Sequence, residues 1–383
     1  MQTVPVKWPV GETFFKPAWL WHETSVLQII QIFKFNDYLE LLKHLYFIPL
    51  LFIGVSCFSQ TLGGRSVYNF LKLAPSPQLS ALGGINNSLI NNDVHLSYHN
   101  PALLNGQMAG TLGANVNLLY GGIKNMFLVY AQRSERWQAN FSGAVNFLSY
   151  GKTDRTDASG NSTGSFNPND FNVQLGFSKN YNERISYGGA LKVISSNYAE
   201  FTSVGLAADI GIVYTDSASL FRAGLVVKNM GVQLKAYNGT AKDDLPFDLQ
   251  LGISKRLEKA PVQFSVTLHH LHRFDIRYAD TSFEAESSGA VKKGKFTLDK
   301  LARHAILSAQ VYPSKQLELT LAYNFLRRKE LSLYNTSNGL TGFSFGAGVL
   351  FKTLQVRFAQ AYYQNSRAYN QFGLNIDLGE VYQ

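Results

Sequence analysis

Apolar residues recur at every second position in many segments of the chain after residue 108. The clearest examples are residues 185–193, with Ile185, Tyr187, Leu191 and Val193 in alternation, and residues 204–214. A period of two is the period of a β-strand with one apolar and one polar face. The segments are about ten residues long, which is the length a tilted strand needs to cross a membrane. The pattern therefore predicts an all-β fold.

Fourteen segments have this alternation, and an even number is expected of a bacterial single-chain membrane barrel. They are residues 108–119, 124–132, 138–148, 170–181, 185–194, 203–214, 221–229, 247–255, 263–271, 303–312, 317–326, 342–351, 353–361 and 371–378.

The connections between these segments alternate in length. Those after even-numbered strands are short: 133–137, 182–184, 215–220, 256–262, 313–316 and 352. Those after odd-numbered strands, apart from the first, are long: 149–169, 195–202, 230–246, 272–302, 327–341 and 362–370. Short periplasmic turns and long extracellular loops are typical of outer-membrane barrels. We therefore predict that residues 108–383 form a 14-stranded antiparallel transmembrane β-barrel in the outer membrane, with both termini periplasmic.

The segment before the first strand, residues 60–107, lacks the alternation. Irregular chain cannot lie in lipid with its backbone groups unpaired, but it can lie in a barrel lumen. Gly83 and Gly84 permit a tight bend, and Pro101 removes a backbone donor just before the first strand. We predict that residues 60–107 form a plug, or hatch, inside the barrel.

Residues 43–59 have the pattern of a secretory signal peptide. Lys43 precedes an apolar run over residues 45–55, and Cys57-Phe58-Ser59 places small residues at −3 and −1 of a cleavage site before Gln60. A lipoprotein attached through Cys57 is the alternative, although Gly54 stands where Leu is preferred. Because Cys57 is the single cysteine, a chain starting at Gln60 has no disulfide or thiol chemistry.

Residues 1–42 show no strand pattern and contain three of the four Trp residues. No Met occurs between Met1 and Met108. We expect a gene start assigned too far upstream, with initiation near Leu41 or Leu42, and a genuine N-terminal extension is the alternative.

Composition agrees with a barrel. Charged residues make up 16% of the chain, against about 25% in soluble domains, and aromatic residues make up 13%. No run of 18 apolar residues follows residue 60, which excludes helical membrane spans there. Residues 1–59 carry four Lys and four acidic residues, so the net charge of +9 belongs to the rest of the chain. Without a nucleic-acid motif, we interpret this charge as basic loops near anionic lipid headgroups.

The candidate chemistry is sparse. Strand alternation would place His270 and His272 on one face and His269 on the other, so at most two could share a metal. His95 and His99 have a metal spacing only on a helix, and we expect them to satisfy backbone groups in the lumen. No pattern selects a Ser–His or acid–His pair. We therefore expect a non-enzyme with no catalytic residue, cofactor or metal.

The segment 272–302 carries both acidic and basic side chains. It is either a solvated charged loop or a docking surface beside the loops 149–169 and 230–246, because loops on a rigid scaffold often bind partners. The candidate partner-binding residues are His270, His272, Arg273, Asp275, Lys292 and Lys293.

Ala81-Leu-Gly-Gly84, followed by Asn100-Pro101-Ala102 just before the first strand, resembles the FadL-like transporter superfamily. The chain is more similar still to the PorQ family of the type IX secretion system of Bacteroidetes, from about residue 61 to its end. The motifs that carry this resemblance are Tyr68-Asn-Phe-Leu71, Leu82-Gly-Gly84, His99-Asn-Pro-Ala-Leu103, Tyr150-Gly151-Lys152, Phe201-Thr-Ser-Val-Gly-Leu-Ala-Ala-Asp209, Leu245-Pro-Phe-Asp-Leu-Gln-Leu-Gly252 and His269-His-Leu-His-Arg273.

The resemblance implies fourteen strands and an N-terminal hatch, in which Gly83, Gly84, Asn100, Pro101 and Ala102 are structural. It also implies a non-catalytic subunit of the complex that attaches secreted cargo to lipopolysaccharide, with PorZ-like, PorU-like and PorV-like partners. The alternative is a FadL-like channel for hydrophobic solutes. A channel needs an apolar cavity that leads from the surface into the wall, with a break in a strand or a mobile hatch, whereas an attachment subunit can have a sealed lumen.

Overall fold

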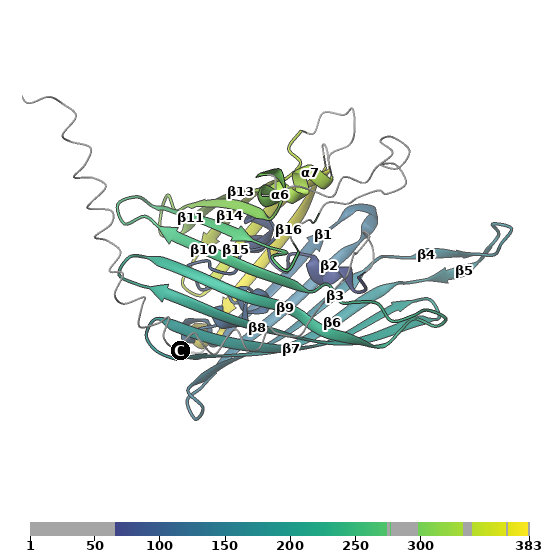
Figure 1. Cartoon of the computed structure of the whole chain (residues 1–383), viewed down its shortest axis with the longest axis horizontal. Helices are drawn as coiled ribbons and strands as arrows, with labels where there is room; N and C mark the ends of the chain where they lie inside the picture. Colours follow the sequence, from purple (N-terminus) through teal and green to yellow (C-terminus); the bar gives the residue numbers. More distant parts are fainter. Residues whose placement is uncertain (1–65, 274–275, 277–297, 332–338, 365–366, 382–383) are drawn as a thin grey trace, which may run out of the picture. The chain divides into compact units, whose positions relative to one another are not determined.

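The computed structural model describes residues 66–273, 276, 298–331, 339–364 and 367–381. The predicted signal peptide, the expected upstream extension, Cys57 and the first residues of the predicted plug lie outside this part of the chain. Fourteen strands form one closed barrel, in the order β1-β16-β15-β14-β13-β12-β11-β10-β9-β8-β7-β6-β3-β2 (Figure 1). This confirms the predicted fold class and strand number.

The barrel strands coincide closely with the predicted segments. They are β1 (Thr111–Leu118), β2 (Lys124–Ser134), β3 (Ala139–Ser149), β6 (Asn169–Asn180), β7 (Ile185–Tyr198), β8 (Phe201–Asp216), β9 (Phe221–Lys235), β10 (Asp248–Arg256), β11 (Val262–Leu268), β12 (Ala305–Val311), β13 (Leu317–Asn324), β14 (Phe343–Leu350), β15 (Leu354–Gln364) and β16 (Arg367–Asp377).

All neighbouring strands of the barrel are antiparallel, and the sheet closes where β1 pairs with β16, with Thr111 opposite Asp377. The register shifts between Ala208 and Ile210 in the β8–β9 ladder, and again near Tyr362 in the β15–β16 ladder. Closure pairs the edge strands with each other, so the barrel has no open sheet edge.

The connections differ from the prediction in two places. Residues 195–202 and 362–370 were expected as long loops, but β7 and β8 are separated only by residues 199–200, and β15 and β16 only by residues 365–366. Their ladders simply continue past the predicted strand ends. The connection after β3 contains a separate two-stranded sheet, β4 (Thr153–Thr156) with β5 (Ser162–Phe166), which extends away from the barrel (Figure 1).

The end of the barrel with the β3–β6, β7–β8, β9–β10, β11–β12, β13–β14 and β15–β16 connections is called the loop side below, and the opposite end is called the turn side. Two short helices, α6 (Leu298–Arg303) and α7 (Phe325–Glu330), lie on the loop side, where Lys329 of α7 forms an ion pair with Asp299 of α6 at 3.2 Å. Strand β13 was predicted to continue to residue 326, but Asn324 ends it and caps α7, because its Oδ1 accepts from the Arg327 amide at 2.9 Å.

The two faces of the sheet have opposite polarity. In β6 the buried, inward positions are Asp170, Asn172, Gln174 and Ser178, whereas the exposed, outward positions include Leu175 at 66%. Leu175 pairs with Leu191 of β7, which is 63% exposed. A water-soluble protein would place these faces the other way round, so the outer surface is suited to lipid. None of the helices in the described residues is long and apolar enough to cross a membrane.

Residues 66–108, called the inner segment below, lie inside the barrel (Figure 1). Their regular elements are η4 (Asn69–Lys72), α3 (Pro77–Ala81), α4 (Leu96–His99), η5 (Pro101–Leu103) and η6 (Gly106–Met108). Their apolar side chains form small buried clusters, one of which joins Leu79, Leu82, Leu89 and Leu96 to Val213 of β8. The hydrophobic core is therefore made largely by a segment that has no strand pattern.

The inner segment runs the length of the lumen. Ser66 forms a bridge with Asp244 in the β9–β10 connection on the loop side, while Met108 precedes β1 on the turn side. The last described element, α8 (Leu378–Val381), begins on the turn side, where the Leu378 amide donates to Gly110 O at 3.0 Å. The two described ends of the chain thus lie at opposite ends of the barrel. That both termini are periplasmic stays a prediction.

Candidate functional site

Local sequence signals shape the inner segment. Ser76 caps α3, its Oγ accepting from the Leu79 amide at 3.2 Å, and Pro77 occupies the first helical position. Gly83 and Gly84 have φ angles of 89° and 102°, a region that glycine enters without a Cβ clash. Asn100 caps η5, its Oδ1 accepting from the Ala102 amide at 3.0 Å, with Pro101 at the first position.

The Gly83–Gly84 bend is fixed to the barrel wall. The carbonyl oxygen of Gly83 accepts from Nδ2 of Asn324 and from Nη2 of Arg327, each at 3.0 Å. Arg327 also donates to Ser344 of β14 at 3.0 Å and lies 3.9 Å from the ring centroid of Tyr363. The bend that the sequence predicts is therefore the place where the inner segment joins the start of α7.

The Asn100–Ala102 motif lies against strands β7, β8 and β9. Nδ2 of Asn100 donates to Asn87 O at 3.0 Å, which ties two parts of the inner segment together. A Cβ atom added at Gly211 would overlap Oδ1 of Asn100 and lie 3.4 Å from Cβ of Ala102. A Cβ at Gly188 would lie 2.7 Å from the carbonyl carbon of Pro101. Glycines in the wall thus make room for the backbone of this motif, and all five predicted hatch residues contact the wall or each other.

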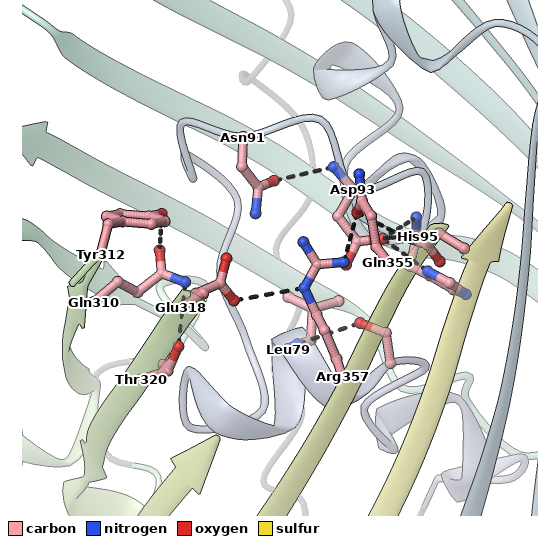
Figure 2. A network of polar contacts seen from close by, with 12 residues as sticks. Leu79, Asn91, Asp93, His95, Gln310, Tyr312, Glu318, Thr320, Gln355 and Arg357 are labelled. Carbon is pink, nitrogen blue, oxygen red and sulfur yellow. Dashed lines mark hydrogen bonds and ion pairs between the residues drawn. The ribbon is translucent and has the colours of Figure 1, made fainter. Parts of the chain in front are cut away.

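One buried ion network joins the inner segment to β13, β15 and β16 (Figure 2). Arg357 of β15 lies between two carboxylates, with Nη1 3.6 Å from Oδ2 of Asp93 and Nε 3.5 Å from Oε1 of Glu318. His95 Nδ1 lies 2.7 Å from Oδ1 of Asp93, which also accepts from Asn375 at 3.0 Å. Burial alone raises the pKa of Asp93, but the charges of His95 and Arg357 outweigh it and hold this pKa well below its usual value.

A second buried network joins β7, β8 and β9. Nζ of Lys192 lies 2.6 Å from Oδ2 of Asp209, and Nζ of Lys228 lies 3.8 Å from the same oxygen. Lys192 also donates to Oδ1 of Asn229 at 2.8 Å, and the Asn229 amide donates to Asp209 at 2.7 Å. Asn229 has a φ of 54° and lies at the register shift of the β8–β9 ladder. This irregularity directs the Asn229 amide toward the Asp209 carboxylate, which the two lysines also approach.

His99 and Tyr98 connect the inner segment to this second network. Lys228 donates to His99 O at 2.9 Å, and His99 Nε2 lies 3.0 Å from Oε1 of Gln250. Burial, followed by the charge of Lys228, lowers the pKa of His99 well below its usual value. Nζ of Lys192 lies 5.3 Å from the ring centroid of Tyr98, close enough for a cation–π contact. His95 and His99 are thus buried as expected, but their imidazole partners are side chains rather than backbone groups.

Sequence reasoning missed Asp209, Lys192, Lys228, Glu318 and Arg357. The signal was present, because each charged residue occupies an inward position of an alternating strand. Examples are Asp209 between Ala208 and Ile210, and Lys192 between Leu191 and Val193. Period two shows that these side chains point into the lumen, but it does not show which charges from different strands meet.

The structure arranges the candidate partner-binding residues on the loop side differently from the prediction. Strand β11 ends at Leu268, and His270 has a φ of 56°, so the alternation that separated His269 from His270 does not reach them. The expected separation is wrong: Nδ1 of His269 lies 2.5 Å from Nδ1 of His270. The ring of His272 packs on Phe247 with centroids 5.0 Å apart, and the Arg273 amide donates to His270 O at 3.0 Å.

The other candidate partner-binding residues, Asp275, Lys292 and Lys293, lie outside the described residues. The candidate docking surface is therefore described at its base, residues 269–273, and at its end, where α6 leads through His304 into β12. The two ends are joined, because the His269 amide donates to His304 O at 3.0 Å.

No protein-family model matches this chain, and no curated protein matches it. Solved structures similar in fold include a mutant of the TodX monoaromatic hydrocarbon channel, with a TM-score of 0.48, 12% identity and coverage of 80% of this chain and 98% of that one. The toluene transporter TbuX of Ralstonia pickettii has a TM-score of 0.44, 12% identity and coverage of 81% and 98%. CdiB from Acinetobacter baumannii has a TM-score of 0.33, 9% identity and coverage of 70% and 59%.

The closed antiparallel barrel, its apolar outward positions and its polar interior define the class of the protein, an outer-membrane β-barrel.

Proposed function

We propose that this chain is a non-catalytic outer-membrane subunit of a type IX secretion attachment complex, and that it positions a PorZ-like cell-surface partner. The observation that carries the proposal is the fixed inner segment. Buried ion pairs and hydrogen bonds tie it to strands around the barrel, among them Asp93–Arg357, His99–Gln250 and Gly83–Asn324. A lumen filled in this way favours a rigid scaffold over a gated passage. The particular secretion system comes from the motif resemblance given above.

The loop side supplies the surface that such a scaffold needs. The β4–β5 sheet extends beyond the barrel, and its strand residues are exposed except for the half-buried Phe166. With the loop side facing out of the cell, this sheet, residues 269–273 and helices α6 and α7 would meet a cell-surface partner or lipopolysaccharide, while PorU-like and PorV-like proteins would complete the complex.

A pull-down of the intact protein in mild detergent tests this proposal. PorZ-like and PorU-like proteins should be recovered with the wild-type chain. A variant in which residues 153–166 are replaced by a short turn should fold but recover less PorZ-like protein. The turn-side variant Glu258→Gln, at an exposed residue, is the control. Absence of secretion partners from the wild-type preparation, with cargo attachment unchanged on deletion of the gene, contradicts the proposal.

The second candidate is a channel for hydrophobic solutes. TodX and TbuX are described as a hydrocarbon channel and a toluene transporter, and none of the structures named above is a type IX secretion protein, so these names agree with the second candidate and not with the first. A channel that opens through a mobile hatch requires the inner segment to move.

A disulfide lock separates the two candidates. Oγ of Ser88 in the inner segment lies 2.9 Å from Oγ of Ser254 in β10, and both residues are buried. A chain starting at Gln60 has no cysteine, so Ser88→Cys with Ser254→Cys introduces one oxidisable pair. Oxidation should abolish toluene or fatty-acid uptake if the protein is a channel gated by the inner segment, and should leave partner recovery unchanged if it is a scaffold. The single variants are the controls.

A further inference from the structure

The loop-side rim of the barrel holds a compact group of metal-ligating side chains. Asp248 at the start of β10 and His269 and His270 after β11 each offer a ligand atom, and these atoms all lie within 4.8 Å of one another. Tetrahedral coordination at bond lengths of about 2.0–2.2 Å separates ligand atoms by roughly 3.4 Å. The three donors therefore need only small side-chain adjustments to converge on one ion.

We propose that Asp248, His269 and His270 form a binding site for a transition-metal dication of the Zn²⁺ type. Two imidazole nitrogens and one carboxylate oxygen are a donor set suited to Zn²⁺, Co²⁺ or Ni²⁺, whereas Ca²⁺ and Mg²⁺ prefer oxygen ligands alone. None of the three ligands belongs to the ion pairs of the two buried networks, although Gln250 links Asp248 to His99 of the second one. The site does not depend on the proposed function.

The two imidazoles present ring nitrogens to the same space. Their Nδ1 atoms face each other at 2.5 Å, closer than an ordinary N–H···N hydrogen bond. A dication between the rings would replace the close nitrogen pair with two coordinate bonds, each through one nitrogen lone pair.

The carboxylate is held in place for this role. Oδ1 of Asp248 accepts from the His270 amide at 2.6 Å, and Oδ2 accepts from Nε2 of Gln250 at 2.7 Å. Each oxygen keeps a second lone pair, and such outer hydrogen bonds orient metal ligands. His304 holds the backbone of His269, because Nδ1 of His304 lies 2.7 Å from the carbonyl oxygen of His269.

A fourth donor is close by. The ring of His272 lies 6.0 Å from that of His270, centroid to centroid, and its buried Nδ1 has no partner among the described residues. A water molecule, or His272 after a side-chain movement, would complete four-coordination.

Nearby positive side chains disfavour the binding of a cation at this site. The charges of Lys72 and Arg273 act on His270 together with that of Asp248. A weakly held cation would be excluded by these positive groups, so strong nitrogen coordination is required. A bound ion would join the start of β10 to residues 269–270, directly after β11.

Metal binding is measured on the full-length mature protein, purified in detergent with a tag that lacks His and stripped with a chelator. Equilibrium dialysis should give one Zn²⁺ per chain, and Co²⁺ should give the intense visible absorption of a tetrahedral nitrogen–oxygen site. His270→Ala and Asp248→Asn should each weaken Zn²⁺ binding at least ten-fold. Glu258→Gln, an exposed carboxylate on the turn side, should bind Zn²⁺ as the wild type does.

Fold is checked by the far-UV circular dichroism of each variant, and His272→Ala provides a milder change that should alter the Co²⁺ spectrum. Less than half an equivalent of Zn²⁺ in the wild type overturns the proposal. So does equal Zn²⁺ affinity in a folded His270→Ala variant, or a Zn²⁺ effect that Ca²⁺ and Mg²⁺ reproduce.

Discussion

The ammonium group of Lys192 lies 2.6 Å from the carboxylate of Asp209 inside the barrel, and both side chains are at most 1% exposed. The pair joins neighbouring strands β7 and β8, and Lys228 of β9 approaches the same carboxylate at 3.8 Å. One buried carboxylate therefore compensates two buried ammonium groups. Because the carboxylate is shared unequally, substitution of each of the three residues should change the free energy of unfolding by a different amount.

Replacing Asp209 should be more destabilising than replacing Lys192. Asp209→Asn removes the carboxylate that both buried lysines approach, whereas Lys192→Met leaves Asp209 beside Lys228. Removing one member of a buried pair typically costs about 3–5 kcal/mol. We expect Asp209→Asn at or above the upper end of this range and Lys192→Met below it, measured by urea unfolding in detergent. Equal losses for the two variants would mean that Lys228 does not share the carboxylate.

Close approach of the inner segment to the wall can be tested at Gly211. Gly211→Ala places a methyl group against Oδ1 of Asn100, and overpacking of this kind costs about 1–3 kcal/mol. Gly143→Ala is the matched control, because its Cβ would meet no heavy atom closer than the 3.9 Å of Leu175 Cδ2. The unfolding midpoint in urea should fall for the first variant and stay within the error for the second. A stable Gly211→Ala protein would contradict the packing of the Asn100–Ala102 motif against β8.

Acid should weaken the attachment of the inner segment at Asp93. The pKa of Asp93 in the folded protein lies below the value of about 3.9 in an unfolded chain. The unfolded state then binds more protons, so this stabilisation is complete above about pH 5 and is lost as the pH falls below about 4. We expect Asp93→Asn to be less stable than the wild type at pH 7 by about 2 kcal/mol.

The same variant should show a smaller loss of stability between pH 5 and pH 3, measured by urea unfolding across that range. Asp154→Asn, an exposed position in β4, should follow the wild-type profile. If Asp93→Asn keeps the full wild-type pH dependence, other carboxylates are responsible for it.

The lipid-facing surface can be tested at Leu175. Leu175 is 66% exposed and lies midway along β6, opposite Leu191. An arginine at the membrane midplane of a barrel costs about 2–4 kcal/mol. Leu175→Arg should therefore lower the unfolding free energy in lipid vesicles by that amount, whereas Thr163→Arg in the exposed β5 strand should have no measurable effect. If Leu175→Arg left the unfolding free energy unchanged, this face of β6 would not contact lipid.

The strands could be predicted from the sequence because a membrane barrel imposes one rule at every position. Lipid requires apolar side chains on one face and the lumen tolerates polar ones, so alternation marks each strand, as in Ile185–Val193. The bends of the inner segment could also be predicted, because they depend on local sequence. Gly83 and Gly84 adopt positive φ, and Asn100 with Pro101 starts a helical turn. These features depend on residues close together in the chain.

Tertiary structure alone decided which distant residues meet. Asp93 and Arg357 are 264 positions apart in the chain, yet they form one buried ion pair because the inner segment passes β15. His269 and His270 approach Asp248 because β11 ends at Leu268, three residues before its predicted end, and His270 turns to positive φ. Alternation specifies a direction, into the lumen or into lipid, but a partner in space is set by barrel closure and by the path of the inner segment, which period two does not encode.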